Sequence, residues 1–112
     1  MTIERKTLKV DVKSRTIEFE LHPYTYRYWP EYGGIYIFLA KPYNSPAWLP
    51  LYMGKAKSLG GRLPNHERWA ESRSKGATHV AFVRIDNTFL RSEIEESLIE
   101  KYSPELNKHF VD

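Results

Sequence analysis

Apolar and polar side chains alternate near the start of the chain. The alternation runs over Thr7–Val12 and again over Thr16–Leu21, and the polar run Lys13-Ser14-Arg15 separates the two stretches. Alternation with a period of two, interrupted by a short polar turn, is typical of two strands joined as a β-hairpin. We therefore expect an N-terminal hairpin.

Three further strands are predicted downstream. Gly34–Ala40 and Leu49–Gly54 are short apolar runs, and the segment between them contains two prolines and an Asn-Ser step, which predicts a loop. Thr78–Ile85 is apolar at alternate positions and predicts the third strand. These strands are expected to form the core of the sheet.

A helix is predicted after Asn87, which is a favourable N-cap, and it should end near Tyr102 because Pro104 follows. At about 100° per residue, Leu90, Ile94 and Leu98 form one buried stripe. Glu95 lies at the edge of that stripe, whereas Glu93, Glu96 and Glu100 lie on the far side. A half-buried glutamate needs a partner, and the spacing leaves open whether that is a basic side chain or a metal ion.

The segment after Leu49–Gly54 is also helical in pattern, with Leu59, Leu63 and Ala70 on one face and Arg62 and His66 at its border. Pro64 interrupts this pattern, because proline is poorly tolerated beyond the first turn of a helix. Either the helix begins near Pro64 after a separate turn, or it is kinked there. The direction of His66 stays open.

Together these elements predict an α+β fold: a small single domain with a central antiparallel three-stranded sheet flanked by helices, plus an N-terminal β-hairpin extension. We expect residues 1–31 to form the hairpin and an aromatic-rich extension, and residues 32–112 to form the main domain. In that extension Tyr24, Tyr26 and Tyr28 would share one face if extended. They could stack on unpaired bases, although packing on the sheet is the commoner role of such aromatics.

Composition narrows the class of protein. The chain has 112 residues, a formal net charge of +3 and no cysteine, which excludes disulfides, thiolate zinc sites and a cysteine nucleophile. No apolar run approaches the roughly 20 residues that span a bilayer. We expect no membrane partner and a cytoplasmic location.

The distribution of charge along the chain is more informative about possible partners than the net charge is. Residues 55–75 hold six basic and two acidic side chains, whereas residues 86–101 hold two basic and five acidic ones. A basic segment beside an acidic one fits a phosphate-facing surface next to a metal-binding carboxylate, and it fits ordinary solvated helices equally well.

Five short motifs follow one another along the chain. They are Gly34-Ile35-Tyr36, Tyr52-Met53-Gly54, Arg62 on the next helix, Glu95 three residues before Leu98-Ile99, and Pro104-Glu105-Leu106-Asn107. This ordered set closely resembles the GIY-YIG nuclease family. The run from Tyr52 to Leu63 is especially similar to the nuclease domains of bacterial excision-repair incision enzymes.

The resemblance implies a metal-dependent endonuclease that hydrolyses DNA phosphodiester bonds by a one-metal mechanism, with low sequence specificity or selectivity for a DNA structure, in DNA repair or a mobile element. It implies that Glu95 holds the cofactor, Mg²⁺ or Mn²⁺, and that Arg62 clamps the scissile phosphate. Tyr52 would take the proton of the attacking water and Tyr36 would orient that water. His66 is the alternative proton acceptor.

Substrate-binding roles are expected for Lys55, Lys57, Gly54, Arg68 and Asn107. Gly54 would leave room for a phosphate or a water at the backbone, and Asn107 would brace the site from its far end. In the long loop, Tyr43 or Trp48 could contact DNA or cover the sheet.

Two other interpretations stay open: a nucleic-acid-binding module that is catalytically inactive, and a protein-interaction domain. An interaction domain would leave the basic segment and Glu95 without a purpose. RNA is not excluded as a substrate. A homodimer, with the hairpin as its interface, or a partner protein could supply specificity.

Overall fold

The computed structural model describes residues 6–110. Residues 1–5 of the predicted extension and residues 111–112 of the predicted main domain therefore lie outside the described part of the chain. Five antiparallel strands form one sheet in the order β1-β2-β5-β3-β4. Their bounds are Lys6–Val12 (β1), Arg15–Pro23 (β2), Gly34–Ala40 (β3), Leu49–Ala56 (β4) and Ala77–Arg84 (β5).

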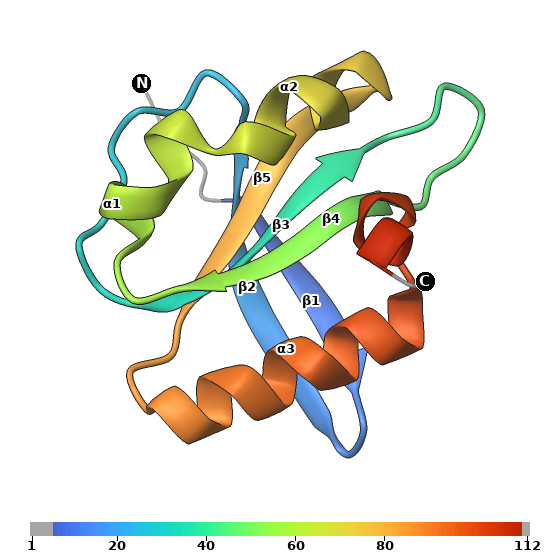
Figure 1. Ribbon diagram of the computed structural model, residues 1–112. Coiled ribbons are helices and arrows are strands. Elements are labelled where there is room, and N and C mark those ends of the chain that lie inside the picture. The colour runs from blue at the N-terminus through green and yellow to red at the C-terminus, as the bar shows by residue number, and fades with distance from the viewer. Residues whose placement is uncertain (1–5, 111–112) are drawn as a thin grey trace.

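Helices cover both faces of this sheet (Figure 1). One face carries the short helix α1 (Leu59–Arg62), the 3-10 turn η1 (Leu63–Asn65) and helix α2 (Glu67–Ser74), and the opposite face carries helix α3 (Thr88–Tyr102), followed by the 3-10 segment η2 (Glu105–Phe110). All seven residues of β3 are buried, because this strand lies between β5 and β4 and packs against both helical layers. The α+β class predicted from the sequence is confirmed.

The N-terminal hairpin forms as expected, and it widens the core sheet. Its second strand, β2, pairs antiparallel with β5, placing Glu20 opposite Phe82 and Leu21 opposite Ala81. The three strands expected in the centre therefore belong to a sheet of five. The tight turn is completed by Lys13, which adopts a positive φ of 54°.

Helix α3 begins and ends where the sequence predicted. The Asn87 side chain accepts a hydrogen bond from the Leu90 N–H at 2.9 Å, and Ser103 ends the helix in the left-handed conformation just before Pro104. The Tyr102 hydroxyl donates a hydrogen bond to the carbonyl oxygen of Asp11 at 2.8 Å. This contact fixes the end of α3 against β1.

Two open questions about aromatic side chains are answered by their packing. Trp48 covers the sheet, since it packs on the main core and makes an edge contact with His79, whereas Tyr43 is fully exposed. The segment after β2 turns rather than running extended. Tyr26 stacks on His22 at a centroid distance of 3.8 Å, while Tyr28 stays 84% exposed.

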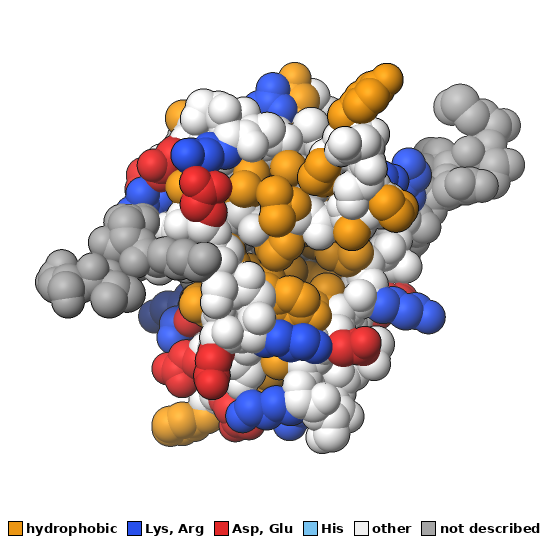
Figure 2. Space-filling view, turned by 90° about the vertical axis from the view of Figure 1, so that its right-hand side faces the viewer, with side chains coloured by type: hydrophobic (Ala, Val, Ile, Leu, Met, Phe, Trp, Pro, Cys, Tyr) orange, Lys and Arg blue, Asp and Glu red, His pale blue; other side chains and the backbone are white. Residues whose placement is uncertain are grey.

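Hydrophobic side chains also gather in a hollow on the side of the molecule seen in Figure 2. An apolar cavity of about 180 Å³ is lined by residues of β1, β3, β4, the loop before β4 and the end of α3, namely Leu8, Lys9, Val10, Ile37, Leu39, Trp48, Pro50, Met53 and Tyr102. Within residues 6–110, no helix has both the length and the apolar character needed to cross a membrane.

Candidate active site

Three of the side chains singled out from the sequence meet on the sheet face that carries α1 and α2. The Tyr36 hydroxyl lies 2.6 Å from Nε2 of His66. The Tyr52 ring lies 5.2 Å from the His66 ring and 6.3 Å from the Tyr36 ring, between centroids. Strands β3 and β4 supply the two tyrosines, and the turn between η1 and α2 supplies the histidine.

Gly54 makes room for Tyr36. The two residues face one another across β3 and β4, and a Cβ at Gly54 would collide with the hydroxyl and the ring of Tyr36. The sequence suggested that this glycine leaves space for a phosphate or a water. On the side where a Cβ would stand, the Tyr36 phenol fills that space.

His66 is placed by a break in the helical segment. Pro64 lies in the 3-10 turn, His66 ends that turn with an extended backbone, and α2 begins at Glu67. As the N-cap of α2, the His66 side chain accepts a hydrogen bond from the Arg68 N–H through Nδ1 at 3.0 Å. The imidazole is thus fixed by both of its nitrogens and is buried, with 5% of the residue exposed.

These two hydrogen bonds define the protonation of His66. A backbone N–H can only donate, so Nδ1 carries no proton, and in a neutral imidazole the proton then sits on Nε2. Nε2 therefore donates to the Tyr36 oxygen. Burial lowers the pKa of His66 to about 4, so the ring is neutral near pH 7. No nitrogen lone pair of this ring is available for a substrate proton.

Tyr52 is half-buried. Its hydroxyl makes no hydrogen bond with any group that the structure describes. Burial raises the pKa of Tyr52, the Arg62 and Arg68 guanidinium groups lower it, and the Glu95 carboxylate raises it. The phenol of Tyr52 therefore lies within electrostatic reach of two cations and one carboxylate.

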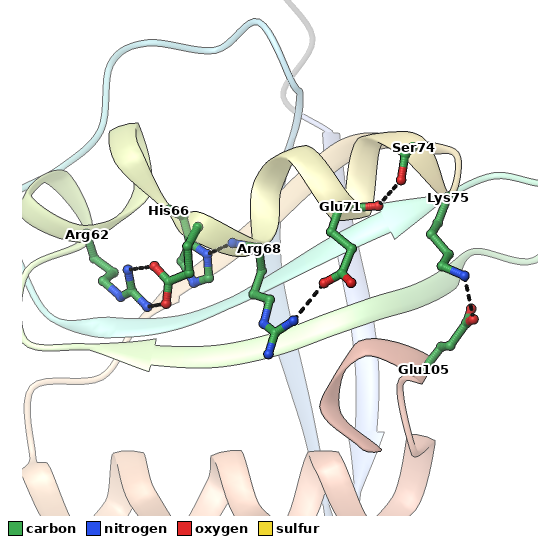
Figure 3. A network of polar contacts seen from close by, with 8 residues as sticks. Arg62, His66, Arg68, Glu71, Ser74, Lys75 and Glu105 are labelled. Carbon is green, nitrogen blue, oxygen red and sulfur yellow. Dashed lines mark hydrogen bonds and ion pairs between the residues drawn. The ribbon is translucent and has the colours of Figure 1, made fainter. Parts of the chain in front are cut away.

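Arg62 and Arg68 extend from the helical segment over β4, the edge strand (Figure 3). Arg62 makes a two-pronged ion pair with Glu67, with N–O distances of 2.7 and 2.8 Å. Arg68 pairs with Glu71 at 2.7 Å. Both arginines thus present their guanidinium groups at the border of the sheet.

Glu95 approaches the same border from α3. Its side chain is 16% exposed, whereas Glu93, Glu96 and Glu100 are exposed, so it faces the body of the protein as the helical spacing predicted. The nearest cation is the Lys55 ammonium at 3.9 Å, and that ammonium donates its hydrogen bond to the Ser92 hydroxyl at 2.8 Å. Burial raises the pKa of Glu95, and Lys55 lowers it.

The donor set around Glu95 fits one hard cation. No cluster of three or more His, Cys, Asp or Glu side chains that could hold a metal occurs in the described part of the chain. Mg²⁺ commonly takes one or two carboxylates and completes its shell with waters and substrate phosphates. The half-buried Glu95 carboxylate, which makes no close hydrogen bond to the groups that the structure describes, suits that arrangement.

Asn107 and Lys57 take different positions. The Asn107 amide accepts from the Met53 N–H and donates to the Met53 carbonyl, both at 2.9 Å. It therefore continues the hydrogen bonding of β4 as a neighbouring strand would. Lys57, just after β4, is exposed.

Arg91 is a residue that the sequence interpretation missed. It is 7% exposed, and its guanidinium donates to the carbonyls of Ile85 at 2.9 Å and Asp86 at 3.1 Å. The guanidinium also fills the space that a Cβ at Gly33 would take. The signal was present, because Arg91 lies on the inner face of α3, one turn before Glu95.

Known proteins resemble this chain in both sequence and structure. No protein-family model matches it. The UvrABC system protein C of Methanococcus maripaludis is 32% identical over 89 residues, which cover 74% of this chain, and the chain spans only 16% of that relative.

Among solved structures, the GIY-YIG N-terminal endonuclease domain of UvrC from Thermotoga maritima, as a point mutant bound to its catalytic divalent cation, is 31% identical with a TM-score of 0.57. The match covers 70% of this chain and 86% of that one. The same domain bound to magnesium is 29% identical, with the same coverage and TM-score.

Proposed function

Because the chain belongs to the GIY-YIG nuclease family, we propose that it is a metal-dependent endonuclease that hydrolyses DNA phosphodiester bonds. The observation that carries this proposal is that Tyr52, on the edge strand β4, lies within electrostatic reach of both Arg62 and Glu95. Electrostatic coupling of Tyr52 to both Arg62 and Glu95 supports their approach to one substrate position. We assign the nuclease domain to residues 32–112 and treat residues 1–31 as an extension that widens its sheet.

Glu95 is the residue that would hold a single divalent cation, Mg²⁺ or Mn²⁺. A bound cation would neutralise the charge that develops on the phosphate and on the leaving oxygen. Burial of Glu95 supports this role, since a carboxylate shielded from water gains more from a cation than an exposed one does.

Arg62 would clamp the scissile phosphate. Its guanidinium already binds the Glu67 carboxylate with two parallel hydrogen bonds, which is the geometry in which arginine binds phosphate. The substrate phosphate would displace Glu67. Lys55, Lys57 and Arg68 would hold neighbouring phosphates, and because phosphates are common to all sequences we expect little sequence preference.

Tyr52 would accept the proton of the attacking water. A phenol must be ionised to do so, and Arg62 and Arg68 favour its ionised form. Tyr36 would orient the water, and His66 would hold Tyr36 by donating a hydrogen bond to it. The fixed tautomer of His66 supports Tyr52, rather than His66, as the base.

Supercoiled plasmid tests the proposal. We expect conversion to nicked or linear DNA in Mg²⁺ and no conversion in excess EDTA. Retarded plasmid that stays intact in Mg²⁺ would instead support the catalytically inactive binding module. Parallel reactions with single-stranded RNA decide between the two nucleic acids.

A further inference from the structure

A cavity of about 260 Å³ opens on the same face of the sheet as Tyr36 and His66, beside the candidate active site. It lies between η1, α2 and the segment that joins β2 to β3, and it is lined by Tyr24, Arg27, Trp29, Phe38, Leu63, Pro64, Trp69 and Val80. None of the residues assigned above to catalysis lines it.

The walls of this cavity are aromatic and its only charge is positive. Four of the eight lining residues carry aromatic rings, and the one charged residue among the eight is Arg27. The Phe38 and Trp69 rings lie 4.4 Å apart, and Tyr24 lies 6.5 Å from Trp69, between centroids. The Arg73 guanidinium lies 3.5 Å from the Tyr24 ring centroid and adds a second cation at the rim.

The rim is held in shape by its own hydrogen bonds. Arg27 donates through one terminal nitrogen to the carbonyls of Tyr24 at 3.1 Å and Tyr26 at 2.9 Å. The Tyr26 hydroxyl donates to the Tyr28 carbonyl at 2.8 Å. Trp29 packs edge-on against Phe82 of the sheet, at 5.7 Å. A ligand would therefore meet a site whose backbone is already in place, which lowers the entropy cost of binding.

The cavity and the candidate active site share a wall. The centroid of the Phe38 ring lies 5.1 Å from that of the His66 ring and 6.0 Å from that of the Tyr52 ring. Leu63 and Pro64 directly follow Arg62 in the chain. A DNA strand with a phosphate at Arg62 would thus pass over η1, and an adjoining base could enter the cavity.

We propose that this cavity holds a single unstacked base of the DNA strand that is cut. The inference rests on the proposed function, which places the scissile phosphate at Arg62. The volume lies below the roughly 300 to 1,000 Å³ of sites for drug-sized ligands and suits one ring system. Aromatic faces and guanidinium groups stack on any base, and positive charge favours the attached phosphates.

A consequence is selectivity for DNA structure. A fully paired duplex keeps its bases stacked, so it must lose a stacking interaction to fill the cavity, whereas a bulge offers an unpaired base at lower cost. The enzyme would then prefer DNA that contains an unpaired base near the cleavage site.

Binding in EDTA tests the inference, because it separates base capture from cleavage. Three labelled duplexes are compared: one fully paired, one with a single bulged base, and one in which the bulged nucleotide lacks its base. The wild-type protein should bind the bulged base about tenfold more tightly than the baseless bulge, as expected for one stacked base. Both bulges interrupt the paired stack at the same position, so the presence of the base is the designed difference between them.

The variants Tyr24→Ala and Arg27→Ala, each on the rim, should each reduce that preference several-fold, while Tyr28→Ala should retain it. Tyr28 belongs to the same segment and is 84% exposed, but does not line the cavity. Tryptophan fluorescence gives a second readout. The duplex with the bulged base should quench it, and the duplex with the baseless bulge should not.

Equal binding of the two bulges by the wild type, or a preference unchanged in both rim variants, would overturn the inference. The same results are expected if an apolar peptide segment, and not a base, occupies the cavity. If the base preference holds but plasmid stays intact in Mg²⁺, the nuclease proposal fails and base capture stands. If plasmid is cut without a base preference, only the base-capture inference fails.

Discussion

The Tyr36 hydroxyl oxygen accepts a hydrogen bond from Nε2 of His66 at 2.6 Å, and the opposite nitrogen of the same ring accepts one from the Arg68 N–H. His66 therefore acts as a donor that fixes Tyr36. The Tyr36 proton is left free to point away from His66. This arrangement gives the two tyrosines different roles, with Tyr36 held and Tyr52 free to exchange a proton.

The pH dependence of cleavage distinguishes Tyr52 from His66 as the base. Burial raises the pKa of Tyr52, so the single-turnover rate should keep rising well above pH 7 as the phenolate fraction grows. With His66 as the base the rate would level off above about pH 5, since its pKa is about 4.

Two variants complete this measurement. Tyr52→Phe should be nearly inactive at every pH, whereas His66→Asn should keep the rising profile at a reduced rate. Near-normal cleavage by Tyr52→Phe would remove the role of base from Tyr52.

Stability should fall in mild acid because His66 is buried in its neutral form. Its pKa is about 4 in the folded chain and near 6.5 when unfolded. Between these values the unfolded state binds more protons, so stability is lost as pH falls from about 6.5 to 4, by roughly 3 kcal/mol for this group. Urea unfolding at pH 7, 5.5 and 4.5 measures the loss.

His66→Asn is the matched control for the stability measurement. Asparagine keeps the N-cap of α2 but does not titrate, so its stability curve should be flatter over this range. The pKa of His79 is also lowered by burial, and it contributes equally to both proteins. Parallel curves for the two proteins would contradict the assignment.

The Glu67 carboxylate binds the guanidinium of Arg62. Removing the charge of Glu67 should therefore favour DNA binding. The Arg62 hydrogen bonds hold the pKa of Glu67 at about 2, so the pair persists at neutral pH. Exposed ion pairs are weak, so Glu67→Gln should tighten DNA binding only about two- to fivefold. Fluorescence anisotropy at two salt concentrations measures this change.

Glu18→Gln changes the net charge equally, on the distant hairpin. It should tighten binding less than Glu67→Gln does, and the difference should shrink as salt rises. If both variants bind DNA equally well, Glu67 does not compete for Arg62.

Asn107→Ala should destabilise the fold by about 1–3 kcal/mol, because the Met53 N–H and carbonyl would lose their partner at the edge of β4. Asn44→Ala, in the exposed loop between β3 and β4, should change the free energy of unfolding by less than about 0.5 kcal/mol. Chemical denaturation compares the two. Equal stability of both variants would show that Asn107 does not brace this strand.

Local patterns were sufficient to predict the elements that surround the site. The apolar runs predicted β3 and β4 closely, and the spacing of Leu90, Ile94 and Leu98 placed Glu95 on the inner face of α3. These features depend on residues near one another in sequence. A strand's period and a helix's repeat carry that information directly.

Contacts between distant segments were not predictable in the same way. The pairing of β2 with β5 joins residues about 60 positions apart. The alternating pattern of the hairpin does not indicate which strand lies beside it. Pro64 predicted a break or a kink in the helix, but only the structure shows that His66 caps α2. Gly54 was interpreted as open space because its Tyr36 neighbour comes from another strand.

The cleavage rate of Glu95→Gln, beside that of Glu96→Gln, tests the central claim most directly. Both changes remove one carboxylate charge from adjacent positions of α3, but only Glu95 faces the sheet edge. With plasmid in Mg²⁺, we predict that Glu95→Gln loses more than about a hundredfold in rate with DNA affinity retained, and that Glu96→Gln cleaves as the wild type does. Normal cleavage by Glu95→Gln would contradict the account.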